Sequence, residues 1–115
     1  MKRGEVYWAD LVPRSGSEQQ GRRPVVVISN NAFNRAQNWR SIIVVPISTS
    51  PTQAGRGLSV VPLGQGTAGL RKDSVVLCHQ VTTIDRTKLT KRIGELSPID
   101  LNLVEHGLKS AMDLV

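Results

Sequence analysis

Two adjacent arginines mark the stretch of this sequence whose residue types could best do chemistry. Arg22 and Arg23 stand between a polar loop, residues 13–23, and an apolar run that begins at Pro24. Proline is tolerated where a strand begins, and it holds the residue before it extended. A guanidinium at that place offers paired donors that stay charged, so it suits a phosphate or carboxylate. Two solvated charges beside a strand are the alternative interpretation.

A second group of candidates follows another apolar run. Ser48, Thr49 and Ser50 form a hydroxyl cluster there, and Glu18 lies in the polar loop. RNA carries its own nucleophile, the 2′-hydroxyl, so its cleavage needs positioning, stabilisation of charge at the phosphorane and a proton for the leaving oxygen. An arginine and a hydroxyl can supply much of this without a metal.

Other catalytic patterns are missing from the sequence. There is no Cys/His cluster of the zinc type, and the nine acids show no close pair at metal-like spacing. Neither a P-loop, a dinucleotide fingerprint nor a G-x-S-x-G elbow is present. We therefore expect no metal and no cofactor. His106 is expected on the polar side of a helix, whereas alternation in a strand would put His79 beside Val75 and Leu77, as a half-buried structural residue or at the rim of a site.

The composition sets limits on the class of protein. The chain has 115 residues, enough for one domain, 1–115, and a net charge of +6 that favours nucleic acid first and an anionic membrane second as partner. Its four aromatic residues are too few for a sheet that stacks several bases. The single cysteine, Cys78, fits a reducing cytoplasm. No signal-peptide core and no run of membrane-spanning length are seen, so we expect a cytoplasmic protein without membrane attachment.

The elements that must position these residues are mostly strands, because short apolar runs alternate with Gly and Pro turns. The expected strands span 6–11, 25–29, 42–47, 58–63, 74–81 and 89–96. We expect one or two helical turns within 30–40, glycine turns at 55–57 and 64–69, and a polar turn at 82–88.

One helix is expected at the end of the chain. Ser97 supplies a capping hydroxyl and Pro98 the first helical position. An apolar stripe follows at spacings of three and four: Leu101, Val104, Leu108, Ala111, Met112 and Val115. Leu103 and Leu114 lie off this stripe, either as exposed leucines or as a second buried face such as a subunit contact. The predicted fold is α+β, mainly β, a small barrel or curled sheet with a C-terminal amphipathic helix.

The order of several motifs resembles the MazF/PemK toxins of bacterial type II toxin–antitoxin systems. The segments that carry the resemblance are Gly4–Leu11, Gly16–Gln19, Arg23–Val27, Val44–Ile47, Asp73–Val75, Gln80–Asp85, Leu89 and Ile93–Leu96. Together they cover nearly the whole chain. The resemblance implies an SH3-like barrel of the CcdB/MazF type and a sequence-specific, metal-independent endoribonuclease that cleaves single-stranded RNA to 2′,3′-cyclic phosphate and 5′-hydroxyl ends, an mRNA interferase.

The resemblance also implies partners. Members of the family form homodimers that bind RNA along the subunit interface. A cognate MazE-like antitoxin, disordered until bound, blocks the same groove with an acidic tail, which suits the basic charge of this chain.

By position, Arg23 matches the catalytic arginine of the family. Ser48 matches a site usually held by threonine; serine keeps the hydroxyl but loses the methyl group that restricts χ1, and Thr49 could serve instead. We expect Arg23 to stabilise charge rather than exchange a proton, since its pKa makes that exchange costly, and the general base is not identified. The residues expected to bind substrate are Ser17, Glu18, Gln19, Thr49, His79 and Gln80.

Two alternatives belong to other classes. The first is a binding toxin like CcdB, which docks the end of its last helix on a target; those helices end in a tip containing tryptophan, whereas this chain ends Met112-Asp113-Leu114-Val115. The second is a degenerate member that binds RNA or antitoxin without cleaving. Substitution of Arg23 distinguishes both from the nuclease.

Overall fold

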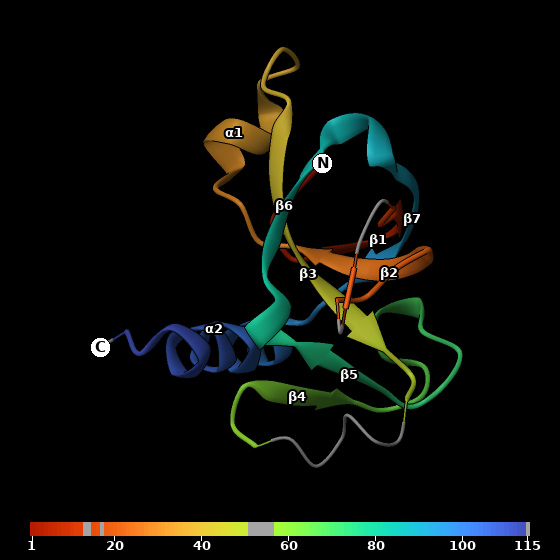
Figure 1. Ribbon diagram of the computed structural model, residues 1–115, viewed down its shortest axis with the longest axis vertical. Helices are drawn as coiled ribbons and strands as arrows, with labels where there is room; N and C mark the ends of the chain where they lie inside the picture. The colour runs from red at the N-terminus through yellow and green to blue at the C-terminus, as the bar shows by residue number, and fades with distance from the viewer. Residues whose placement is uncertain (13–14, 17, 51–56, 115) are drawn as a thin grey trace.

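A curled antiparallel sheet and one long helix make up the molecule (Figure 1). The computed structural model describes residues 1–12, 15–16, 18–50 and 57–114. The strands are β1 (Glu5–Asp10), β2 (Arg22–Val27), β3 (Ser41–Ser48), β4 (Val60–Leu63), β5 (Ser74–Leu77), β6 (Thr82–Asp85) and β7 (Leu89–Glu95). The helices are α1 (Asn31–Arg35) and α2 (Pro98–Met112), with 3₁₀ turns η1 (Thr67–Gly69), η2 (Cys78–Gln80) and η3 (Arg86–Lys88).

Strand β3 connects the two parts of the sheet. The strand order is β4-β5-β3-β2-β1-β7, and β6 pairs separately with β3. The first part of β3 pairs with β6 and β2, and its last two residues, Ile47 and Ser48, pair with β5. The prediction of a mainly β, α+β fold with a C-terminal helix is confirmed. Among the described residues no pairing joins β7 to β4, so the barrel is not closed.

The central strands are buried on both faces of the sheet, which explains their continuous apolar runs. Val26 and Val45 face one cluster, which α2 covers through Val104 and Leu108. Val25 faces the other cluster, and the remaining members of that second cluster are Ala9, Leu11, Val27, Ile42, Val44 and Ile84.

Helix α2 begins where the sequence predicts. The Ser97 side chain accepts a hydrogen bond from the Asp100 N–H, with 3.1 Å between oxygen and nitrogen. The predicted apolar stripe is correct only in its first half, because Val104 and Leu108 are buried, whereas Ala111 and Met112 are exposed. The helix has run past the edge of the sheet by that point (Figure 1).

Three further apolar residues of the C-terminal segment were considered from the sequence: Leu103, Leu114 and Val115. Leu103 and Leu114 are exposed in the isolated chain, which fits both interpretations, exposed leucines and a subunit contact. Val115 lies outside the described residues.

Two predicted boundaries in the second half of the chain are wrong. Strand β5 ends at Leu77 rather than at residue 81, because Cys78 turns inward beneath α2 and the Val81 N–H closes a 3₁₀ turn on the Cys78 carbonyl. Residues 82–88 are not a simple turn but contain β6 followed by η3. The β-branched residues of β6 pair with the beginning of β3.

The other elements agree more closely with prediction. Strands β1, β3, β4 and β7 match the predicted ones within two residues at each end. Helix α1 provides the expected helical turn. Strand β2 is shifted towards the N-terminus: it starts at Arg22 and stops at Val27, since the N–H groups of Ile28 and Ser29 both bond the Ile43 carbonyl. The predicted turn at 55–57 lies mostly outside the described residues.

Candidate functional site

The two arginines belong to strand β2 itself and not to the loop before it. Arg22 pairs in register with Asp10 and Arg23 with Ala9 on β1. The Arg22 guanidinium lies 4.5 Å from the centre of the Trp8 ring, in a cation–π contact. The expectation that the two arginines precede the strand is therefore wrong, because pairing with β1 holds the backbone of both.

Arg23 and Ser48 lie at the same end of neighbouring strands. The last registered pair between β2 and β3 is Val25 with Pro46, and each of the two residues stands two positions beyond that pair. Because side chains alternate along strands, this position places both on the same face of the sheet. Beyond the pair, Pro24 has no N–H to donate, and β3 turns to pair with β5.

The two hydroxyls proposed for the site differ in their surroundings. The Ser48 side chain is buried, with 4% of the residue exposed, and its Oγ accepts a hydrogen bond of 3.0 Å from the Ser50 N–H. Thr49 is exposed. Ser48 thus has a fixed hydroxyl, whereas Thr49 offers a more accessible one.

The loop before β2 folds back over the arginine. The Arg23 Nε–H donates to the Gln20 carbonyl at 2.9 Å, and the Leu11 N–H donates to the Gly21 carbonyl at the same distance. Gly21 has a φ of 78°, a left-handed conformation that glycine adopts without strain. The loop therefore returns to the sheet at Gly21 and holds the Arg23 guanidinium by one of its donors.

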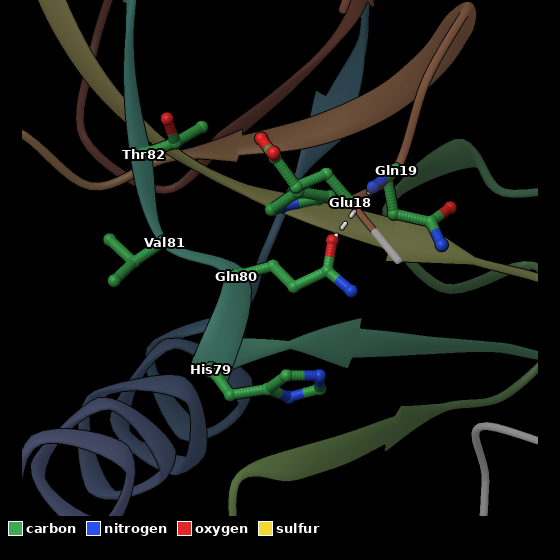
Figure 2. Close-up of a pocket in the computed structure, with 7 residues that line it drawn as sticks. Glu18, Gln19, His79, Gln80, Val81 and Thr82 are labelled. Atoms are coloured by element: carbon green, nitrogen blue, oxygen red, sulfur yellow. Dashed lines mark hydrogen bonds between the residues drawn. The ribbon is translucent and has the colours of Figure 1, made fainter. Parts of the chain in front are cut away.

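A polar pocket lies between this loop and the η2 turn (Figure 2). Its volume is about 310 Å³, and it is lined by Glu18, Gln19, Pro46, His79, Gln80, Val81 and Thr82. The Gln80 side chain extends towards the loop, and its Oε1 accepts a hydrogen bond from the Gln19 N–H at 2.8 Å (Figure 2). Amide and carboxylate groups from two segments therefore surround one space, whose volume is at the lower end of the range for small-molecule pockets.

The pocket unites four of the residues predicted to bind substrate: Glu18, Gln19, His79 and Gln80. It does not include Arg23, Ser48 or Thr49, and Ser17 lies outside the described residues. The other three lining residues also belong to segments that carry the family resemblance: Pro46, Val81 and Thr82. No signal in the sequence singled them out as pocket residues.

The predicted setting of His79 is wrong. The residue lies in the η2 turn and is exposed, so it does not share a strand face with Val75 and Leu77, which are buried. In Figure 2 its ring stands at the edge of the pocket, away from the Gln80 amide. Its position fits the second interpretation, a group at the rim of a site.

The only cysteine is unsuited to act as a nucleophile. Burial raises the pKa of the Cys78 thiol to about 11, and its Sγ donates to the Val104 carbonyl at 3.6 Å. Within the described ranges, no three His, Cys, Asp or Glu side chains gather as a metal site would require. None of the helices in the described part of the chain is long and apolar enough to cross a membrane.

The curled sheet and its candidate site define a small basic protein of mainly β structure, with an arginine and a hydroxyl at the same end of two neighbouring strands and a polar pocket between the loop before β2 and η2. Residues 2–112 match the family described as "PemK-like, MazF-like toxin of type II toxin-antitoxin system", and the chain belongs to this family. The predicted family is thereby confirmed.

Relatives of known name cover the chain almost completely. "Endoribonuclease MazF2" of Mycobacterium bovis is 36% identical over 99% of this chain and 98% of its own length. "Endoribonuclease EndoA" of Bacillus subtilis is 36% identical over 100% of this chain and 97% of its own. Among solved structures, MazF of Deinococcus radiodurans superposes with a TM-score of 0.81 at 25% identity, covering 99% of this chain and 97% of that one.

Another solved structure adds a partner for a relative. It is described as a mycobacterial endoribonuclease in complex with its cognate antitoxin, and it matches with a TM-score of 0.78 at 25% identity. The match covers 98% of this chain and 95% of the other. The similarity thus extends over the whole fold rather than over one motif.

Proposed function

We propose that this chain is an endoribonuclease toxin that cleaves single-stranded RNA at specific sequences, without a metal, by attack of the 2′-hydroxyl on the adjacent phosphate. The products are a 2′,3′-cyclic phosphate and a 5′-hydroxyl. The observation that carries the proposal is the register of β2 and β3, from which Arg23 and Ser48 both stand two residues beyond the last pair, in a chain whose relatives are named endoribonucleases.

In this proposal Arg23 stabilises the negative charge that develops on the phosphorane oxygens. Its guanidinium is planar, stays charged and has donors beyond the one that holds the Gln20 carbonyl. Such preorganised donors contribute most where charge appears only in the transition state. The Ser48 hydroxyl, or that of Thr49, donates a further hydrogen bond to the phosphate, and Glu18, Gln19, His79 and Gln80 bind the neighbouring nucleotides.

The proposal includes partners and compartment. A homodimer is proposed because α2 leaves Leu103 and Met112 exposed, at 45% and 47%, in an isolated chain. An acidic, disordered antitoxin segment is the proposed inhibitor, supported by the net charge of +6 and by the relative solved with its cognate antitoxin. The cytoplasm is the proposed location, since it holds both RNA and a reducing environment for Cys78.

The decisive experiment is cleavage of a long single-stranded RNA by purified protein in EDTA, with the new ends sequenced and chemically typed. Wild-type protein is expected to make discrete cuts that end in cyclic phosphate. The variant R23A should lose about 10²- to 10³-fold in kcat, the usual effect of removing one donor to a developing oxyanion. R22A is the matched control, because the neighbouring arginine is engaged with Trp8.

Further variants decide which hydroxyl takes part. If Ser48 supplies it, S48A loses activity, S48T keeps it and T49A has little effect; the reverse pattern assigns the role to Thr49. A folded wild-type protein that makes no cuts in any RNA tested would contradict the proposal and favour a binding toxin.

A further inference from the structure

Two hydrogen bonds meet on consecutive residues of the loop that precedes β2. The Gln19 N–H donates to Gln80 Oε1 at 2.8 Å, and the Gln20 carbonyl accepts from Arg23 Nε at 2.9 Å. The loop backbone at 19–20 therefore lies between the Gln80 side chain and the Arg23 guanidinium. The two bonds form a relay from η2 to the arginine.

The end of the relay at Gln80 is anchored in the body of the protein. Gln80 belongs to η2, which begins at the fully buried Cys78. The Cys78 N–H bonds the Ser59 carbonyl at 2.9 Å, and its Sγ lies where α2 passes at Gly107. A Cβ at Gly107 would come within 2.7 Å of that sulfur, so helix and turn are in close contact. Gln80 thus connects the loop to a well-packed part of the fold.

The end of the relay at Arg23 has a direct chemical consequence. A guanidinium is a planar fork with five N–H donors. Once Nε–H is directed at the Gln20 carbonyl, the plane of the fork and the direction of its two terminal amino groups are set. Small displacements of catalytic groups are costly, because about 1 Å of misplacement can reduce a rate by about 10²-fold.

We propose that Gln80 is a positioning residue, which orients Arg23 for cleavage by holding the loop backbone at residues 19–20. The inference rests on the proposed function for its catalytic meaning, although the relay itself is a structural statement. For Gln80, this positioning role replaces the direct nucleotide contact that was proposed above from its place in the pocket.

Two substitutions separate the relay from direct substrate contact. Q80M keeps a side chain of similar length but removes the acceptor, whereas Q80E keeps an acceptor for the Gln19 N–H. If Gln80 positions Arg23 through the relay, Q80M lowers kcat by about 10²-fold with little change in KM, and Q80E keeps a kcat close to that of wild type. If Gln80 instead contacts RNA directly, both variants raise KM and leave kcat unchanged. The added negative charge then gives Q80E the larger increase in KM.

A measurement without RNA tests the relay independently of activity. In ¹⁵N NMR spectra of the full chain, Q80M should shift the Gln19 amide and speed hydrogen exchange at Arg23 Nε at least tenfold, while Q80E should not. H79A is the matched control for these spectra, because His79 shares η2 and the pocket but has no part in the relay. Unchanged Arg23 Nε exchange in a folded Q80M protein would overturn the inference.

The proposed function can fail separately from the relay. If wild-type protein cleaves no RNA but Q80M releases Arg23 Nε, the nuclease proposal is wrong and the relay stands as a structural feature. If wild-type protein cleaves RNA and Q80M retains full kcat, the relay has no catalytic role and the inference is refuted.

Discussion

Replacing Gly94 with alanine tests how closely β7 packs against η1. An alanine Cβ at this position would lie 2.3 Å from the Ala68 carbonyl oxygen and 2.5 Å from its carbonyl carbon. Ordinary contacts begin near 3.4 Å, so the shortfall is about 1 Å against backbone atoms that have no rotamer to change. Ala68 has little freedom to adjust, since its φ of 52° is already left-handed and the adjacent Gly69 lies close against the backbone of Ile93 in the same strand.

The expected cost is about 2–3 kcal/mol of unfolding free energy. Overpacking costs about 1–3 kcal/mol, and a clash that forces one backbone segment away from another belongs at the upper end of that range. The loss of glycine flexibility in the unfolded chain returns about 0.4–1 kcal/mol. With a urea m-value of about 1–3 kcal/mol/M, the midpoint should fall by about 0.7–3 M.

The assay is urea unfolding of G94A and of a control, G64A, at equal protein concentration. Gly64 has no atom within 4 Å of an added Cβ and no positive φ, so G64A should match wild type or be slightly more stable. A midpoint for G94A that equals that of G64A would refute the reasoning. It would mean that η1 and β7 can move apart to accept the methyl group with no loss of unfolding free energy.

Three further predictions concern other parts of the fold. The Arg86 guanidinium donates to four carbonyls within residues 33–39, at 2.9–3.1 Å. Lysine cannot reproduce this planar set of donors, so R86K should lower the thermal midpoint and reduce the unfolding free energy by about 2 kcal/mol. Cys78 should resist iodoacetamide at pH 8 in native protein and react in urea, because burial raises its pKa to about 11; rapid native alkylation would contradict this. Burial raises the pKa of Glu5, but the hydrogen bonds from Arg92 and the Lys2 N–H outweigh it, and the net pKa falls below 4.5. The ionised Glu5 therefore stabilises the folded protein above that pH, and this stabilisation is lost on acidification. In a plot of unfolding free energy against pH, E5Q should reduce the slope on the acid side.

Much of the fold was predictable where local chemistry is decisive. The start of α2 follows from a capping serine and a proline, whose effects depend on their own backbone. The central strands follow from β-branched runs buried on both faces. The end of β5 was not predictable, because the apolar run continues through Cys78 and periodicity does not distinguish a strand from the turn that packs it under α2. Strand β6 was missed since its polar residues are stabilised by pairing with β3, some 40 residues earlier.

In the candidate site, too, the residues could be predicted from the sequence, whereas their contacts with distant segments could not. Arg23 and Ser48 were predicted from their residue types beside apolar runs and from the family positions that they match, and the register of β2 and β3 was needed to show that they lie at the same end of these strands. The sequence named Gln19 and Gln80 separately as residues that bind substrate. Their hydrogen bond joins positions 61 residues apart, and no local pattern contains it. Contacts of this kind depend on how the loop folds back, which only the assembled structure defines.

The pairing of β1 with β7 sets a condition on how the chain is made. Glu5 pairs with Glu95 and Ala9 with Leu89, so the first strand meets one of its two neighbours only after residues 89–95 exist. To pair such distant segments, the chain must close a long loop before any stabilising contact forms, and the entropy cost of that closure slows folding. Synthesis proceeds from the N-terminus, so a ribosome-bound chain that lacks residues 89–95 exposes one edge of β1. The pairing of β1 with β7 can thus form only after residues 89–95 have been synthesised.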